Sequence, residues 1–401
     1  MKLHKNLFAG SLGTAFEFYD YTLYGVFAPL FAEIFFPGGN HYIKLMLSLS
    51  VFAVSFFVRP LGALIFGLIG DKYGRKKALK LTITLMGLST FLVGILPSYQ
   101  QIGILAPILL TLLRSIQGFC AGGEHNGSAI FVIEHTEKGK KGLMGSFIYS
   151  SAVLGNLMAL IIGSIVLNAS MPEWAWRLPF LVSIIFAYMT YHLRQRAKET
   201  PVFLNVTSKK LPLIDFYNQY KLALIKTIII GSYNGILIYM LSVYMNIHMI
   251  NNNNYSQSYS VAVVAFTLSL LLGLIPIVGK LSDKYGYRRI MSLGCLFIIL
   301  VAYFIFQWIK VGGMFVIVAQ VIFAMGVSFF VGPMHAFLNE LFPPLYRYRA
   351  ITTCFSVGLA LFGGTTPLIA SSLIKMTGFQ EAPAFLLIFG ALIGLLVLRK
   401  L

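Results

Sequence analysis

The sequence has few charged residues, and this shortage excludes most soluble folds. Charged residues make up 11% of its 401 positions, and only 13 residues are acidic. A soluble domain has about 25% charged residues, which help to cover its water-facing surface. Because 58% of the residues are hydrophobic, a surface that faces lipid is the simplest solution.

Cysteines and chemical motifs are equally scarce. The three cysteines, Cys120, Cys295 and Cys354, lie inside apolar runs without C-x-x-C spacing, which favours packed thiols over disulfides or metal ligands. The sequence contains no nucleophile elbow and no phosphate-binding loop, and His125 and His335 are isolated. We therefore expect neither an enzyme nor a metal or cofactor site.

The sequence does contain a series of long apolar runs. A membrane-spanning helix needs about 20 apolar residues, so twelve such helices use roughly 240 residues. We predict an all-α membrane protein with 12 transmembrane helices in two bundles of six, residues 1–193 and 221–401, joined by a cytoplasmic linker at 194–220. The runs are 7–32, 44–70, 78–97, 101–133, 142–168, 176–193, 222–250, 258–280, 290–309, 312–340, 348–374 and 380–398.

Lysine and arginine are distributed unequally over the loops between these runs. The two ends and every second loop hold 25 of them, and the other loops hold 4. Because basic residues are enriched on the cytoplasmic side of a membrane protein, both termini are predicted to be cytoplasmic. The net charge of +18 then follows from membrane topology and does not indicate nucleic acid as a partner.

One loop sequence occurs twice. Residues 67–77 read GLIGDKYGRKK and residues 279–289 read GKLSDKYGYRR, at an offset of 212 residues. Each copy joins the second and third run of its half. Duplication of a six-helix unit is the natural explanation for such a match at equivalent positions.

This loop resembles the G-x-x-x-D-[KR]-x-G-R-[KR] signature of the major facilitator superfamily. More narrowly, the chain resembles the metabolite:proton symporters that include the proline/betaine transporters, and the resemblance spans nearly the whole chain. Four further stretches carry it. They are Gly13–Asp20, Arg59-Pro-Leu-Gly62, Arg114-x-x-Gln117-Gly118 with Gly122-Gly123-Glu124, and Asn339-Glu340-Leu-Phe-Pro343 with Gly363-Gly364-x-x-Pro367. The osmoregulatory members have a long C-terminal extension that this sequence lacks, so osmotic sensing is not expected.

The signature loop has a physical explanation as a latch. Asp71 ends an inward-running helix, where the helix dipole disfavours an anion. The resemblance implies that it faces the start of another helix near Tyr348, and the repeat implies that Asp283 faces the helix that begins near Gly142. We hypothesise that these loops latch the outward-facing state, through the residues Asp71, Gly74, Arg75, Asp283 and Arg288. The alternative is an ordinary charged loop that sets topology.

Five charged residues lie deep inside the runs, where an unpaired charge costs about 3 kcal/mol. They are Glu17, Asp20, Arg59, Arg114 and Glu124. Three acids and two arginines leave one negative charge, which a single proton would neutralise. We expect Asp20, Glu124 and Glu17 to couple proton movement to transport, with Arg114 as their counter-ion or as a clamp for a substrate carboxylate. The alternative is a set of static buried ion pairs.

Further polar and aromatic residues on predicted helix faces are candidates for substrate binding. With Arg114, a carboxylate clamp and aromatic faces for a quaternary ammonium fit proline or betaine, although an arginine suits a dicarboxylate equally well. The candidates are Arg114, Gln117, Tyr24, Tyr149, Asn156, Tyr233, Asn234 and His335.

These features and the resemblance together predict a secondary transporter in the bacterial inner membrane. We expect proton-coupled uptake of a small organic solute by alternating access, with the proton gradient as energy source and a monomer as the functional form. Its partners are the solute, protons and the lipid bilayer. The alternative is a proton-driven exporter of drugs or siderophores. The run 142–168 contains no proline, which favours uptake. A channel would need no duplicated loops.

Overall fold

A computed structural model of the chain describes residues 2–168, 170–205 and 213–399, and within these ranges it contains helices and no strand. The described part of the chain is therefore all-helical. In chain order, the helices are α1 (Lys2–Phe35), α2 (His41–Tyr73), α3 (Arg75–Ile95), α4 (Tyr99–Ile102), α5 (Leu105–Glu134), α6 (Lys141–Val166), α7 (Arg177–Arg196), α8 (Pro201–Leu204), α9 (Leu213–Tyr239), the π-helical turn η1 (Met240–Tyr244), α10 (Met245–Asn253), α11 (Gln257–Tyr285), α12 (Tyr287–Val311), α13 (Met314–Glu340), α14 (Pro344–Phe362), α15 (Thr366–Thr377) and α16 (Pro383–Leu398).

The chain divides into two compact units. Unit 1 comprises Met1–His135, Ser151–Thr207 and Pro344–Thr353, and unit 2 comprises Thr136–Ser150, Ser208–Pro343 and Cys354–Leu401. Each unit thus includes the first turns of one helix whose remainder lies in the other unit: the start of α14 in unit 1 and the start of α6 in unit 2. Part of the predicted linker, residues 206–212, lies outside the described residues.

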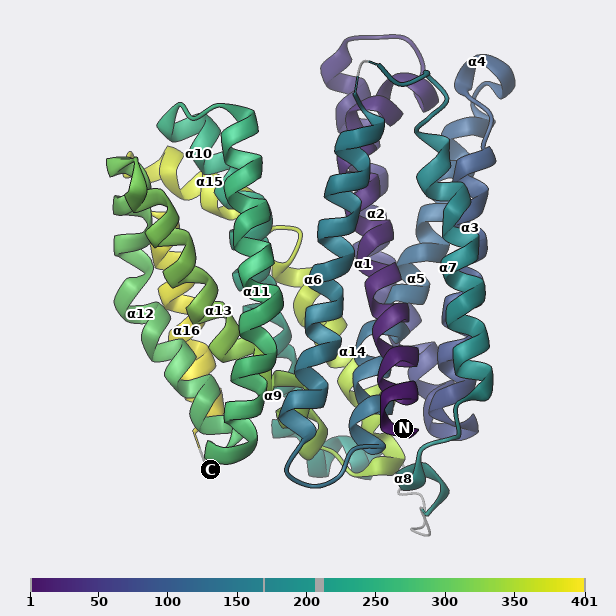
Figure 1. The fold of residues 1–401 in the computed structure, drawn as a ribbon, viewed down its shortest axis with the longest axis vertical. Helices are drawn as coiled ribbons and strands as arrows, with labels where there is room; N and C mark the ends of the chain where they lie inside the picture. Colours follow the sequence, from purple (N-terminus) through teal and green to yellow (C-terminus); the bar gives the residue numbers. More distant parts are fainter. Residues whose placement is uncertain (1, 169, 206–212, 400–401) are drawn as a thin grey trace. The chain divides into compact units, whose positions relative to one another are not determined.

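Unit 1 is a bundle of long helices that run side by side (Figure 1). Its most extensive contacts join α2 to α5 and α3 to both α5 and α7. The helices approach closely because glycine lies at the crossings: a Cβ atom at Gly62 of α2 would stand 1.8 Å from the carbonyl oxygen of Phe119 in α5. Small residues of this kind are typical of helix contacts in membranes.

An aromatic cluster fills one end of unit 1. The ring of Phe31 lies 5.3 Å from that of Trp176 and 5.6 Å from that of Phe180, and all three side chains are buried. The N-terminus and α8 lie at the opposite end of this unit, as Figure 1 shows. Edge-to-face and tilted ring contacts thus fill one end of the bundle, whereas charged residues gather at the other.

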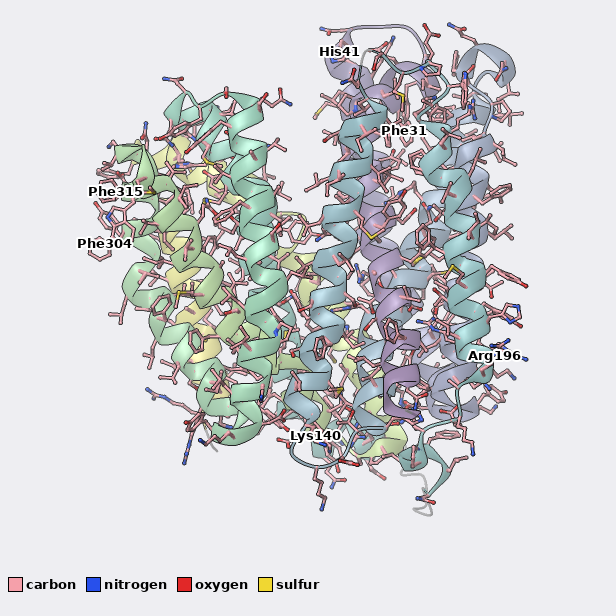
Figure 2. All side chains as sticks on the ribbon, viewed as in Figure 1. Phe31, His41, Lys140, Arg196, Phe304 and Phe315 are labelled. Carbon is pink, nitrogen blue, oxygen red and sulfur yellow. The ribbon has the colours of Figure 1, made fainter. Side chains whose placement is uncertain are left out.

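Unit 2 packs α12 between α13 and α16, and α11 also lies against α13. Its outer surface is apolar, since Phe304 of α12 is 51% exposed and Phe315 of α13 is 49% exposed. Figure 2 shows both rings projecting away from the helices. Exposed aromatic residues in such number are compatible with lipid as the surrounding solvent.

The helix bounds agree with the apolar runs to within a few residues, apart from the run 222–250, whose helix begins at Leu213. Nine helices of the described residues are long and apolar enough to cross a membrane. Three details were not predicted. The run 101–133 contains the separate short helix α4, the run 222–250 contains the π-helical turn η1, and the run 348–374 is interrupted at residues 363–365 between α14 and α15.

The close crossing at Gly62 gives a test of the packing. Gly62→Ala should destabilise the detergent-solubilised protein by about 1–3 kcal/mol, because the added methyl group would overlap the backbone of α5. The control is Gly25→Ala in α1, where nothing lies within 4 Å of the added Cβ and a gain of about 0.4–1 kcal/mol is expected. Thermal unfolding of both variants measures the difference, and equal unfolding temperatures would contradict the crossing.

Candidate functional site

Three buried carboxylates in unit 1 each contact one arginine. Glu17 pairs with Arg59, Asp20 with Arg114 at 3.0 Å, and Glu124 with Arg194. All six side chains are buried. The structure therefore brings together the five charges predicted from the sequence and adds a sixth.

The sixth charge corrects the charge count made from the sequence. We counted Arg194 with the basic residues of the cytoplasmic loops, because it follows an apolar run and stands close to Arg196 and Lys198. In the structure it lies in the last turn of α7 with its guanidinium inside the bundle. The cluster thus has three acids and three arginines, and the predicted excess of one negative charge is wrong. A long arginine near a helix end can reach inward as easily as outward.

Glu124 has the fullest set of donors of the three carboxylates. Arg194 donates to both of its oxygens, with Nη1 at 2.9 Å from Oε2, and the hydroxyls of Thr82 and Ser128 also donate to it. Arg194 in turn donates to the carbonyl oxygens of Ala9 and Leu79. This arrangement joins α1, α3, α5 and α7 around one ion pair.

Asp20 is also well supplied with donors. Its Oδ2 accepts from Arg114 Nη1, and its Oδ1 accepts from the hydroxyl of Thr90 at 2.9 Å and from Gln117 Nε2 at 2.8 Å. Gln117 Oε1 accepts a further bond from Arg114 Nη1 at 2.9 Å. The predicted residues Asp20, Arg114 and Gln117 therefore form one network that links α1, α3 and α5.

Arg114 keeps one edge of its guanidinium free. Its Nε and Nη2 are buried and have no hydrogen-bond partner among the described residues. The guanidinium lies 4.4 Å from the ring centroid of Tyr24, 5.2 Å from that of Tyr21 and 5.8 Å from that of Phe52. Nε and Nη2 form the side-on edge of an arginine, whose two parallel donors match a carboxylate.

Glu17 is the least satisfied carboxylate. Its Oε1 accepts from Arg59 Nη2, while its Oε2 is buried without a hydrogen-bond partner among the residues that the structure describes. A buried carboxylate oxygen without a donor is costly in its charged form. Glu17 is therefore the carboxylate with the fewest hydrogen-bond donors of the three among the described residues.

The remaining substrate candidates fall into separate places. In unit 1, Asn156 accepts a hydrogen bond from the hydroxyl of Thr22 at 2.7 Å. In unit 2, the hydroxyl of Tyr149 donates to Asn234 at 2.6 Å, and its ring lies 5.9 Å from that of His335. Tyr149, Asn234 and His335 thus form a neutral polar group.

Tyr233 does not join that neutral group. Its ring lies 4.7 Å from that of Phe330, and a Cβ atom at Gly390 of α16 would stand 2.7 Å from it. Tyr233 and Asn234 are consecutive in α9, and consecutive residues point about 100° apart on a helix. Tyr233 is therefore part of the packing of unit 2.

The signature loop forms the helix contact predicted for Asp71. Its Oδ1 accepts the backbone N–H of Tyr348 at 3.1 Å, and its Oδ2 accepts that of Arg349 at 3.2 Å, both in the first turns of α14. A carboxylate near a helix N-terminus meets the positive end of the helix dipole. Whether this contact acts as a latch stays a prediction.

Two glutamates missed in the sequence complete this network. Glu134, at the end of α5, accepts from Arg75 at 3.2 Å, from Arg347 at 2.9 Å and from the hydroxyl of Thr200 at 2.7 Å. Glu199 accepts the backbone N–H groups of Arg75 and Lys76 at the start of α3. Glu134 stands where an apolar run meets a loop, and Glu199 lies in the predicted linker, so their positions alone gave no signal of these contacts.

Glu199 also explains why residue 74 is a glycine. Gly74 has a φ of +101°, a backbone conformation that favours glycine. A Cβ atom at this position would stand 2.2 Å from Glu199 Oε2. The predicted residue Gly74 therefore allows both the sharp turn between α2 and α3 and the approach of this carboxylate.

In the second copy of the loop, an aspartate again contacts the start of a helix, and a tyrosine replaces the arginine beside it. Asp283 accepts the backbone N–H groups of Gly142 at 2.7 Å and Leu143 at 2.9 Å, at the start of α6. The hydroxyl of Tyr287 also donates to Asp283 at 3.1 Å, whereas the predicted Arg288 has a buried Nη1 without a partner among the described residues. Tyr287 stands at the position of Arg75 in the repeat, so the offset itself could have identified it.

The pair of Glu124 and Arg194 makes a testable prediction. Arg194→Met should destabilise the protein by about 3–5 kcal/mol, because it leaves Glu124 as an unpaired buried charge. The double variant Arg194→Met with Glu124→Gln should recover most of this loss. Arg196→Met, which removes an exposed charge, is the control and should change stability by less than about 0.5 kcal/mol.

Unfolding of the solubilised variants in a double-mutant cycle measures this coupling. The cycle also includes the single variant Glu124→Gln. If the double variant lost as much unfolding free energy as Arg194→Met and Glu124→Gln lose together, Arg194 and Glu124 would not interact.

Two family models match the chain. The model described as "Sugar (and other) transporter" matches residues 6–219, and the model described as "Major Facilitator Superfamily" matches residues 227–401. Among solved structures, the proton:xylose symporter XylE bound to 6-bromo-6-deoxy-D-glucose has a TM-score of 0.78 and 15% sequence identity, covering 98% of this chain and 94% of that one. At this identity the likeness shows the fold.

Curated relatives extend the match to sequence over nearly the whole chain. The proline/betaine transporter of Escherichia coli (strain K12) is 34% identical, covering 98% of this chain and 82% of that protein. The glycine betaine/proline/ectoine/pipecolic acid transporter of Dickeya dadantii (strain 3937) is 33% identical with the same coverage. The chain is therefore a multi-pass membrane protein of the major facilitator superfamily of transporters, and belongs to the family of the proline/betaine transporters.

Proposed function

We propose that this protein takes up a small zwitterionic or carboxylate solute, of the class of proline and betaine, together with protons. In this proposal α1, α7 and α16 complete the nine long apolar helices to twelve spans, with both termini cytoplasmic in a bacterial inner membrane and a monomer as the active form. These three helices are not among the nine for different reasons. The helix α1 contains charged residues, α7 has a polar end, and α16 is short.

The free edge of Arg114 is the observation that carries the choice of substrate. Two parallel buried N–H donors, Nε and Nη2, have no partner among the described residues, and such a pair matches a carboxylate. The family relatives named above are transporters of proline and glycine betaine, which both carry a carboxylate. In our proposal the solute binds through this group to Arg114.

Electrostatics then couples the solute to a proton. Arg114 already neutralises Asp20, at 3.0 Å. The solute carboxylate and Asp20 would then share one guanidinium. This leaves one negative charge in excess at that point of a low-dielectric interior, which favours binding of a proton to one of the two acids. Solute binding and proton binding thus support one another, and the proton gradient serves as the energy source without a cofactor.

The three candidate proton sites differ in how well they suit this role. Glu124 accepts from four donor groups across three residues and is held by Arg194. Asp20 shares its arginine with the proposed solute site, and Glu17 has one oxygen without a donor among the described residues. We therefore assign the moving proton to Asp20 and Glu17, with Glu124 as the fixed charge that holds Arg194.

The energy is adequate for accumulation. One elementary charge that crosses 100 mV supplies about 2.3 kcal/mol, which corresponds to about 50-fold accumulation of a neutral or zwitterionic solute.

The loop contacts supply the proposed conformational switch. Asp283 binds the first N–H groups of α6, and Asp71 binds the N–H groups of Tyr348 and Arg349 in the second turn of α14. Each aspartate thus contacts a helix from the other half of the sequence. In an alternating-access cycle such contacts form in one state and break in the other. We propose that they latch the outward-facing state, with Arg75 joining Asp71 to Glu134.

Export by the same fold is the second candidate. A drug exporter would use the same proton sites in the opposite direction, and the absence of proline from α6 is the feature of the described helices that favours uptake. Transport direction decides between them.

Proton coupling is tested by uptake into proteoliposomes. With proline, betaine, citrate and oxoglutarate as separate solutes, the wild type should accumulate at least one when the outside is acidic. Asp20→Asn should abolish the accumulation that the pH gradient drives, because it removes the titratable group. It should retain solute counterflow, because it keeps a hydrogen-bonding side chain. The control is Glu33→Gln, which removes an exposed carboxyl that contacts Lys44. This variant should behave as wild type. Failure of all four solutes to show pH-dependent uptake would count against symport.

The latch is tested by accessibility. In a chain whose native cysteines are replaced by alanine, a reporter introduced as Asn156→Cys is labelled from each side of the membrane. Asp71→Asn should increase cytoplasmic labelling about 10- to 100-fold, since charge-assisted hydrogen bonds worth about 1.5–3 kcal/mol are lost. The exposed loop variant Glu137→Gln is the control. Unchanged labelling and unchanged transport in Asp71→Asn would refute the latch.

A further inference from the structure

A group of lysines lies at the turn between α2 and α3, next to the end of α7. The lysine cluster consists of Lys72, Lys76, Lys77 and Lys80, and Arg196 adds a fifth positive charge. All five side chains are exposed or half-exposed. Figure 2 shows Arg196 projecting from the end of α7 away from the bundle. None of these residues was used in the binding site or in the contacts of Asp71.

The cluster is not neutralised by the protein. The nearby carboxylates are already occupied: Asp71 and Glu134 bind Arg75 and the start of α14, and Glu199 binds the start of α3. None of the four lysines forms an ion pair with a carboxylate in the part of the chain that the structure describes. Their positive charge therefore requires an external anion or water.

The lysine side chains are held in place. Nζ of Lys72 and Nζ of Lys77 lie 5.0 and 4.6 Å from the ring centroid of Tyr73. Lys80 lies 4.8 Å from the ring of Tyr191 and donates to the side-chain oxygen of Gln195, and Lys76 donates to the backbone oxygen of Gln195 at 2.8 Å. Side chains that are already ordered lose less entropy when they bind a ligand.

An exposed apolar wall begins one turn further along the same helices. On α3 it contains Leu81 and Leu88, which are 41% and 48% exposed. On α7, which packs along α3, it contains Ile185, Tyr188 and Met189, each more than half exposed. A ligand that fills both regions has an anionic head beside the lysines and an apolar tail along the wall.

We propose that the lysine cluster and this wall bind an anionic phospholipid, with its phosphate beside Lys77 and Lys80. The phosphate meets positive charge that no described carboxylate compensates, and the acyl chains cover the wall of α3 and α7. A zwitterionic phospholipid fits less well, because its own ammonium group would lie among the lysines. A free phosphate would leave the apolar wall unused.

Native mass spectrometry of the full-length protein, titrated with phosphatidylglycerol or phosphatidylcholine, tests this proposal. The wild type should retain phosphatidylglycerol preferentially. Lys77→Gln/Lys80→Gln should weaken phosphatidylglycerol binding about thirtyfold, at about fivefold per lysine, and leave phosphatidylcholine binding unchanged. The control is Lys138→Gln/Lys140→Gln, which removes two exposed charges from the loop before α6 and should bind as wild type.

Three results would overturn the proposal. Equal retention of the two lipids would show that the site does not select charge. An equal loss in the control variant would show a general effect of net charge. Displacement of phosphatidylglycerol by millimolar inorganic phosphate would show a free phosphate site. If the double variant unfolds, wild-type phosphatidylglycerol retention that is unaffected by 0.5 M salt would contradict the proposal instead.

Discussion

Every charge inside this protein requires a neighbour of opposite charge, because the apolar interior provides no water to stabilise it. This constraint organises unit 1. The acids on α1 and α5 are placed opposite arginines from α2, α5 and α7, so the helices that meet there are fixed in rotation and depth by their ion pairs. In a bundle without these charged residues, nothing would fix the rotation and depth of each helix in this way, since lipid and leucine are nearly equivalent as neighbours.

The two units meet this constraint differently. Unit 1 contains the paired acids and arginines, whereas the predicted polar group of unit 2 consists of the neutral residues Tyr149, Asn234 and His335. The repeated loop is explained by duplication of a six-helix unit, yet only its contact with a helix is kept in both copies. The buried charges of unit 1 thus depend on ion pairs, whereas the polar group of unit 2 depends on neutral hydrogen bonding and ring contact.

Much of this architecture could be predicted from the sequence, because apolar length and the repeat are properties of the chain itself. The helix ranges are an example, and the repeat carried the contact of Asp71 over to Asp283. The helix contact of Asp71 itself was implied by the resemblance to the major facilitator superfamily. Arg194, Glu134 and Glu199 were missed, since each stands at the boundary between a helix and a loop. At a boundary, hydropathy does not determine whether a long side chain turns into the bundle or toward water. Tyr287 was missed for another reason: we matched the repeat by charge and not by position.

The contact of Asp71 with α14 uses two backbone N–H groups, and the guanidinium of Arg349 lies 3.8 Å from the same carboxylate. Any amino acid except proline supplies the same N–H group, so this part of the contact does not depend on which side chains occupy positions 348 and 349. The side chain of Tyr348 is constrained separately, since it is buried and its hydroxyl donates to the carbonyl oxygen of Gly123. Proline is therefore the residue that this geometry selects against at both positions in evolution, whatever other side chain it would replace.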